Sequence, residues 1–213
     1  MAIVQNPITG RTKKKFGSAV FSKQFGKNVM RTKPLEVKNP KTPGQVNQRS
    51  KFKLMVFVSR QLMGLIRISF QNMAIGKSAF NAFVSANIKT AITGVPGNYS
   101  IDWPLLKISK GPLFQSSNLV AAVDQAAMIK RTWNPPINPD DISNSDKLFT
   151  IAFNITKNEW SYGQSVTIRS AASDEQGVPA SWAGDTVHVY TFFISPDGKQ
   201  CSDSVYSGTV VIL

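Results

Sequence analysis

The sequence of this protein is poor in the residues that most often carry catalysis and metal binding. Among 213 residues it has one cysteine, Cys201, and one histidine, His188. A single cysteine excludes an internal disulfide framework and a cysteine-based structural zinc site. A single histidine excludes a multi-histidine metal site. We therefore expect Cys201 to be a small residue in a strand, and His188 to lie on a strand face rather than to act as a catalytic base.

Long hydrophobic runs are also missing. No window offers the roughly 20 apolar residues of a membrane-spanning helix, because the most apolar stretch, residues 54–70, is interrupted by Arg60, Gln61 and Arg67. The first seven residues contain no apolar segment long enough for a secretory signal. We expect neither a membrane span nor a signal peptide, and synthesis in the cytoplasm.

Acidic residues are scarce in the first half of the chain. Residues 1–110 hold 19 Lys or Arg against Glu36 and Asp102, whereas residues 111–213 hold 6 Lys or Arg against 10 acids. The formal net charge of +13 therefore belongs to the first half. A basic half of this kind predicts a polyanion or an acidic protein surface as its partner, and the second half has the balance of an ordinary solvated domain.

The first 41 residues form the most basic segment, with phenylalanines interleaved among the cations. Residues 18–22 and 27–31 resemble two short strands, and Gly26 between them favours a hairpin turn. Such a composition fits phosphate contacts with base stacking, and it equally fits an assembly arm that docks on a protein lattice. The candidate contacts to a polyanion or an assembly partner are Arg11, Lys13, Lys14, Lys15, Lys23, Lys27, Arg31, Lys33 and Arg49, and the candidate aromatic anchors are Phe16, Phe21 and Phe25.

Helix signals begin at Thr42. This residue suits an N-cap, Pro43 suits the first helical position, and Gln45 completes a capping box. Apolar residues at a period near 3.6 predict a helix over residues 42–70. A second helix is expected from Ser78, as its N-cap, to Gly94, as its C-terminal glycine. The two would form a helical hairpin.

The pattern changes to period two after residue 99. Seven short candidate strands separated by Pro and Gly turns predict a β-sandwich. The expected strands cover residues 105–109, 118–123, 127–133, 148–155, 165–170, 185–194 and 204–211. The predicted fold class is therefore α+β: a basic arm with a hairpin at 1–41, a helical hairpin at 42–98, and an antiparallel β-sandwich at 99–213.

Two motifs resemble a phosphate-binding loop and a calcium-binding loop, but their residue spacing does not match either. Gly76-Lys77-Ser78 has the end of a phosphate-binding loop, but Gln71 stands where that loop needs a glycine. We expect a glycine that ends one helix and a serine that caps the next. A group of oxygen-bearing residues lacks the alternate spacing, glycine turn and final glutamate of a calcium loop, and is expected to be a solvated loop. Its members are Asp140, Asp141, Asn144 and Asp146.

Several blocks resemble an uncharacterised bacterial family of unknown function, over nearly the whole chain. They are Asn39-Pro-Lys-Thr-Pro-Gly-Gln45 with Arg49 and Phe52, Ser78-Ala-Phe-Asn81, Ser109-Lys-Gly111, Pro179-Ala-Ser-Trp-Ala-Gly-Asp185 and the tail Tyr190–Gly208. The resemblance implies a basic arm, an Asn-Pro-x-Thr-x-x-Gln helix start and a C-terminal domain that is immunoglobulin-like or fibronectin-III-like. It supplies no catalytic residues. The first block is also similar to small proteins encoded in phage genomes.

These observations lead to a hypothesis of function. We expect a non-enzymatic structural protein of a phage virion or related particle, anchored by its basic arm. The alternative is a cytoplasmic nucleic-acid-binding accessory protein. The expected partners are particle proteins or further copies of this chain in an oligomer or lattice, and nucleic acid through the arm. No cofactor and no small-molecule substrate are expected. The expected location is the virion or particle, after synthesis in the bacterial cytoplasm.

Overall fold

The computed structural model describes residues 2–3, 14–36, 39–138 and 142–213. The chain divides into two compact units, residues 1–46 and residues 47–213. Each unit is described by itself below. Together they make an α+β protein, as the sequence predicts.

The first unit is a four-stranded antiparallel sheet in the order β1-β4-β3-β2. Its strands are β1 (Ala2–Ile3), β2 (Lys14–Phe16), β3 (Ala19–Gln24) and β4 (Lys27–Thr32). The predicted hairpin is confirmed as β3 and β4. Phe25 and Gly26 connect these strands with φ angles of 49° and 83°, and two left-handed residues match the twist of a tight hairpin.

The helical segment is more broken than its periodicity predicts. The expected helix 42–70 is two helices, α1 (Pro43–Gln61) and α2 (Met63–Ser69), followed by the 3₁₀ turn η1 (Gln71–Met73). Leu62 interrupts them with φ −105° and ψ 16°. The backbone of Thr42 accepts a hydrogen bond from Val46 N–H at 3.0 Å, which agrees with a helix that begins after Thr42.

The second predicted helix extends too far towards the C-terminus. Helix α3 (Ala79–Asn87) begins after Ser78, whose Oγ accepts a hydrogen bond from Asn81 N–H at 3.2 Å. It ends well before Gly94, because the following residues pair as the hairpin β5 (Ile92–Val95) and β6 (Asn98–Ile101). Gly94 has φ 105°, and a Cβ there would lie 2.3 Å from the carbonyl oxygen of Asn98. This glycine therefore serves a close strand approach rather than a helix end.

The C-terminal part is a seven-stranded β-sandwich. The strands are β7 (Val120–Gln125), β8 (Met128–Thr132), β9 (Lys147–Asn154), β10 (Glu159–Ile168), β11 (Ser173–Gly177), β12 (Thr186–Ile194) and β13 (Val205–Val211). They form one sheet ordered β10-β9-β12-β13 and another ordered β11-β8-β7. Three expectations were wrong here. Residues 105–109 form no strand. The strand expected at residues 165–170 is β10, which begins at Glu159 and ends at Ile168. The strand β11 was not predicted, since its polar residues carry no apolar alternation.

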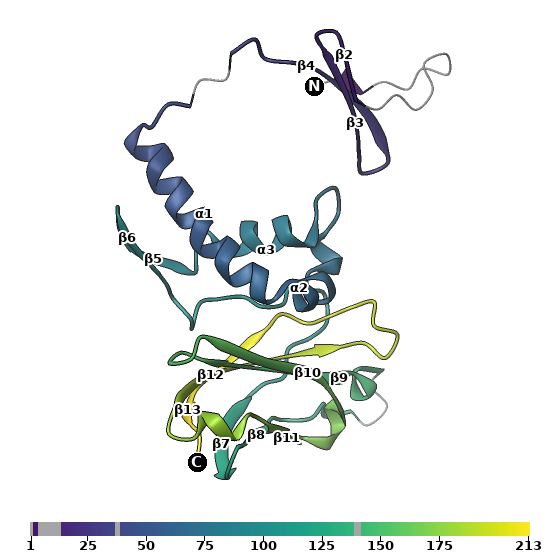
Figure 1. Cartoon of the computed structure of the whole chain (residues 1–213). Coiled ribbons are helices and arrows are strands. Elements are labelled where there is room, and N and C mark those ends of the chain that lie inside the picture. Colours follow the sequence, from purple (N-terminus) through teal and green to yellow (C-terminus); the bar gives the residue numbers. More distant parts are fainter. Residues whose placement is uncertain (1, 4–13, 37–38, 139–141) are drawn as a thin grey trace. The chain divides into compact units, whose positions relative to one another are not determined.

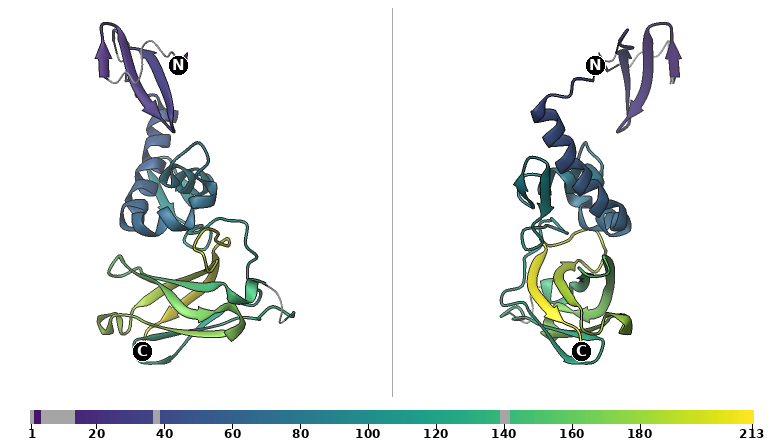
Figure 2. Two further views of the ribbon diagram at one scale, coloured as in Figure 1. Left: turned by 90° about the vertical axis from the view of Figure 1, so that its right-hand side faces the viewer. Right: turned by 60° about the vertical axis from the view of Figure 1, so that its left-hand side comes forward.

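The sheet β10-β9-β12-β13 lies between two covering layers (Figures 1 and 2). Along β12, Val187 and Val189 point into the cluster between the two sheets, where they join Ile129 and Trp182. Tyr190 and Phe192 belong to a second cluster, which is completed by the helices. The helical members include Met55, Leu62, Leu65, Ile66, Phe70 and Phe83.

This second cluster is continuous across residue 98. The predicted domain boundaries after residues 41 and 98 stay predictions, but a cut after residue 98 would divide a shared hydrophobic core. None of the helices in the described part of the chain has the length and hydropathy to cross a membrane.

Candidate interaction surfaces

The register of the sheet β1–β4, called the basic sheet below, distributes the predicted cations over both faces. Lys14 stands opposite Phe21, and Lys15 stands opposite Val20, which also faces Arg31. Because side chains alternate along a strand, Lys14 and Lys23 share the Phe21 face. The other face carries Lys15, Lys27 and Arg31.

These cations surround almost no core. The described side chains predicted as contacts in this unit are all exposed: Lys14, Lys15, Lys23, Lys27, Arg31 and Lys33. Val29 is the one buried residue of the first unit among those whose side chains the structure describes. The sequence has no acid between Lys14 and Leu35. The basic sheet therefore exposes positive charge on both faces with no carboxylate in its strands to neutralise it.

Two of the predicted aromatic anchors, Phe21 and Phe25, lie at different places on the basic sheet. Phe21 is half-buried on a face of β3, whereas Phe25 stands at the hairpin turn and is 56% exposed. Phe16 is paired in register with Ala19. Arg11 and Lys13 lie outside the described residues. Arg49 belongs to α1 in the second unit, so the structure does not place it with the other predicted contacts.

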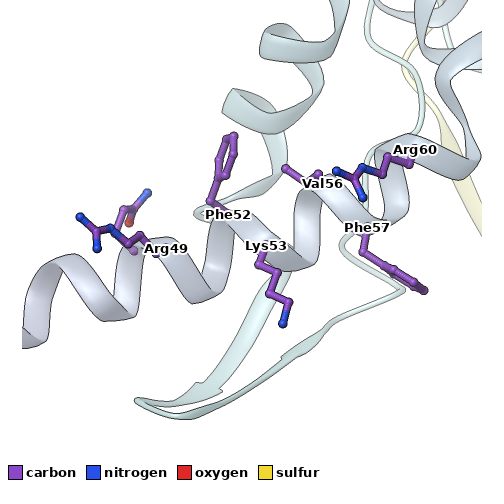
Figure 3. Close-up of a pocket in the computed structure, with 7 residues that line it drawn as sticks. Arg49, Phe52, Lys53, Val56, Phe57 and Arg60 are labelled. Atoms are coloured by element: carbon purple, nitrogen blue, oxygen red, sulfur yellow. The ribbon is translucent and has the colours of Figure 1, made fainter. Parts of the chain in front are cut away.

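A second basic surface lies along α1 and was not predicted as a whole. Seven residues of this helix line a hollow of about 730 Å³, and we call them the α1 stripe (Figure 3). They are Gln48, Arg49, Phe52, Lys53, Val56, Phe57 and Arg60. Their spacing of one, three and four residues places them along one side of a helix.

The α1 stripe combines apolar side chains with cations. Phe52 is 45% exposed and Phe57 is 49% exposed, although the periodicity of the sequence assigns Phe52 to the covered side of the helix. Figure 3 shows Arg49, Lys53 and Arg60 spread along the helix beside these apolar side chains. The sequence holds no acid from residue 37 to residue 101. A signal was available in retrospect: this helix has four cations, no anion and apolar residues on more than one side.

His188 lies on a strand, as expected, whereas the expectation that Cys201 lies within a strand was wrong. His188 lies in the middle of β12, with its Nδ1 2.8 Å from the hydroxyl of Tyr206 and its ring 5.8 Å from that of Trp103. Burial lowers the pKa of His188, so the ring is neutral at pH 7. Cys201 is fully buried in a β-bridge with Ile194 rather than within a strand, and burial raises the pKa of its thiol.

The two failed motifs have the local structures of a turn and a partly buried loop. Ser78 caps α3, as expected. Gly76 was expected to end a helix, and this was wrong: it has φ 68° in a bend three residues after η1 ends at Met73. The loop with oxygen-bearing residues was expected to be solvated, and this is wrong for Asp146. Its carboxylate is buried and pairs with Nη2 of Arg169 at 2.9 Å, because a buried charge needs an opposite partner. Asp140 and Asp141 lie outside the described residues, and the described part holds no group of three residues suited to a metal.

A buried polar network inside the sandwich also escaped the sequence analysis. Arg131 is fully buried and donates from Nη2 to Oε1 of Gln176 at 2.6 Å. It stands opposite Asp174 in the β8–β11 pairing, and Asp174 accepts from the hydroxyls of Ser165 and Thr167 at 2.6 Å each. Burial lowers the pKa of Arg131 to about 10, although Asp174 acts in the opposite direction. The guanidinium therefore stays charged at neutral pH.

Residues 11–208 match the model of a family of unknown function, DUF6266. The chain belongs to this family, which confirms the predicted resemblance. The search of curated proteins found no match. Among solved structures, the chain is similar to the fn3 domain of human collagen alpha-1(XX) chain, with 13% identity, a TM-score of 0.34, and coverage of 46% of this chain and 83% of that one. The FN5 domain of Drosophila Lar gives 12% identity, a TM-score of 0.31, and coverage of 43% and 87%.

Proposed function

We propose that this chain is a non-enzymatic structural protein of a phage virion or a related particle, held in place through its basic N-terminal unit. The observation that carries the proposal is the basic sheet, which exposes cations on both faces around a single described buried residue, Val29. The phage-like block at residues 39–45 supports the particle as the setting.

The basic sheet has too small a hydrophobic core to be stable by itself. A sheet needs a hydrophobic face packed on something to be stable in water, and ordering each residue costs backbone entropy of roughly 1–2 kcal/mol. One buried valine offsets little of this cost. A surface that neutralises Lys14 and Lys23 and covers Phe21, which share one face, would supply both missing contributions. Particle proteins or further copies of this chain in a lattice are the proposed partners.

The same sheet favours a second candidate, a cytoplasmic nucleic-acid-binding accessory protein. Its specific support is the row formed by Lys15, Val20 and Arg31 together with the exposed ring of Phe25. Cations without neighbouring carboxylates suit phosphates, and an exposed ring suits base stacking.

The first experiment locates the protein. Particles purified from cells that produce this chain should contain it, as measured by mass spectrometry after density-gradient separation. They should lose it when the chain is produced without residues 1–41. Full attachment of that truncated chain would contradict the anchoring role, and absence of the intact chain from particles would contradict the structural one.

The second experiment separates the partners by salt. The variant Lys13→Ala, Lys14→Ala, Lys15→Ala should weaken binding to particles or to a 30-nucleotide DNA, and Phe21→Ala with Phe25→Ala tests the apolar contribution. For nucleic acid, each phosphate contact that is lost reduces the slope of log affinity against log salt by about 0.9. The matched control is Lys89→Ala, Lys107→Ala, Lys199→Ala, which removes three exposed cations from the second unit. Loss of attachment in the aromatic variant alone, without salt dependence, would reject the electrostatic proposal.

A further inference from the structure

We infer that the α1 stripe is a docking site for an acidic amphipathic helix of a partner protein. Its residues belong to the second unit, and the inference does not depend on the function proposed for the basic sheet.

The hollow along α1 has a form on which a second helix can pack. The lining residues that the structure describes come from one helix, between Gln48 and Arg60. Ridges of side chains spaced three and four residues apart are the surface into which a second helix packs. A hollow of about 730 Å³ along one helix therefore has the form of one half of a helix–helix contact. The stripe spans 12 residue steps, which is about 18 Å at 1.5 Å per residue.

Apolar side chains form the floor of this hollow. Phe52 and Phe57 keep close to half of their surface exposed, and Val56 lies between them on the helix. An amphipathic helix covers such side chains with apolar residues at i, i+3 or i+4, and i+7. A nucleic acid strand would satisfy the cations but offers base faces for stacking, and Val56 has no ring to receive one. The apolar floor therefore favours a protein helix.

Positively charged side chains border the apolar floor. Arg49, Lys53 and Arg60 border the floor, and no acid occurs in residues 37–101. A second α1 packed antiparallel on this stripe would bring Arg49 of each copy towards Arg60 of the other, and like charges in contact cost affinity. A partner helix with Asp and Glu beside its apolar positions would instead pair with Lys53 and Arg60. The occupant is therefore acidic, with about 12 residues in contact.

The test uses the full chain and two matched synthetic peptides. Both are 15-residue helices with leucines at positions 3, 7, 10 and 14. One has glutamates at the flanking positions, and the other has lysines there. Fluorescence anisotropy should show binding of the acidic peptide in the micromolar range and binding of the basic peptide at least about tenfold weaker. Phe52→Ala with Phe57→Ala should weaken the acidic peptide at least about tenfold, since apolar anchors dominate such interfaces.

Charge reversal sharpens the test. Lys53→Glu with Arg60→Glu should exchange the preference, so that the basic peptide binds more tightly than the acidic one. Two controls should leave the acidic peptide unchanged: Phe114→Ala, which removes another exposed aromatic ring, and Lys14→Ala with Lys15→Ala, which weakens the basic sheet alone. Equal thermal unfolding of all variants shows that the fold is kept.

Three results would overturn the inference. One is the absence of acidic-peptide binding at about 100 µM, or binding that ignores Phe52→Ala with Phe57→Ala. Another is a 15-nucleotide single-stranded DNA that binds more tightly than the acidic peptide and is lost with the same two substitutions. The last is self-association in light scattering that Phe57→Ala abolishes, because a second copy would then occupy the stripe. None of these outcomes bears on attachment through the basic sheet, which the Lys14 and Lys15 variant reports separately.

Discussion

The basic sheet and the sheet β10-β9-β12-β13 have the same number of strands and the same antiparallel pairing, yet they differ in what covers them. In the basic sheet, Val29 is the one described buried residue. In the other sheet, β12 is buried at every position after Thr186, and β9 at every position after Lys147. The first sheet has cations on both faces, and the second has hydrophobic layers on both.

This difference shows that strand pairing does not by itself define a stable sheet. Backbone hydrogen bonds contribute little net free energy, because water also bonds these groups in the unfolded chain. Burial of apolar surface supplies the larger part, at about 25 cal/mol per Å². The sheet β10-β9-β12-β13 obtains this contribution within the chain, whereas the basic sheet is expected to obtain it from a partner.

The largest expected effect comes from removing one covering layer. A fragment of residues 100–213 lacks the helices that cover Tyr190 and Phe192, so we expect it to aggregate or to show no cooperative unfolding. A fragment of residues 42–213 keeps both layers and should unfold cooperatively. Thermal unfolding followed by circular dichroism, with size-exclusion chromatography, measures both. A cooperative, monomeric 100–213 fragment would show that the sandwich does not need the helices.

The next effect compares one aromatic residue from each sheet. Phe192 is 1% exposed and stacks on Phe149 with centroids 4.9 Å apart, so Phe192→Ala should lower the free energy of unfolding by about 3–5 kcal/mol. Phe25 is 56% exposed, and Phe25→Ala should change it by less than about 0.5 kcal/mol. Chemical denaturation of the full chain gives both values. Similar losses in the two variants would mean that the basic sheet has a core of its own.

A smaller effect on stability is expected at the start of α3, whose residue Phe83 shares a hydrophobic cluster with the sheet β10-β9-β12-β13. Ser78 accepts a hydrogen bond from Asn81 N–H, and Ser78→Ala should cost about 1 kcal/mol. Ser78→Asp keeps an oxygen acceptor and should restore most of the stability. If denaturation finds no difference between Ser78→Ala and the unchanged protein, the cap contributes nothing to the helical layer.

The smallest effect is a change in the pH dependence of stability. Burial lowers the pKa of His188 below its ordinary value near 6.5, so the unfolded chain binds a proton more readily than the fold. Stability should therefore fall as the pH drops through about 6.5 towards the folded-state pKa. His188→Gln should reduce the slope of unfolding free energy against pH between 7 and 5. An unchanged slope would assign that pH dependence to other groups, and the basic sheet, which has no histidine, should contribute none.

Several features followed from the sequence alone because local chemistry decides them. Phe25-Gly26 between two alternating segments was enough for the hairpin, and Ser78 after Gly76 was enough for a helix start. The alternation in residues 185–194 was enough to predict a strand there, with His188 on one of its faces. The division of charge also needed no structure, since the absence of acids between residues 37 and 101 is a property of composition.

Other features were decided only by tertiary contacts. The sequence predicted that Gly94 ends a helix. In the structure, Gly94 pairs β5 with β6, where the two backbones come so close that a Cβ would not fit. The sequence around Asp146 predicted a solvated loop. In the structure, Asp146 is buried because Arg169, 23 residues later in the chain, forms an ion pair with it. Phe52 had the periodicity of a covered residue, but periodicity states which side chains share a face and not which face is covered. That choice depends on where the sheet and the other helices pack, and their packing left the α1 stripe exposed.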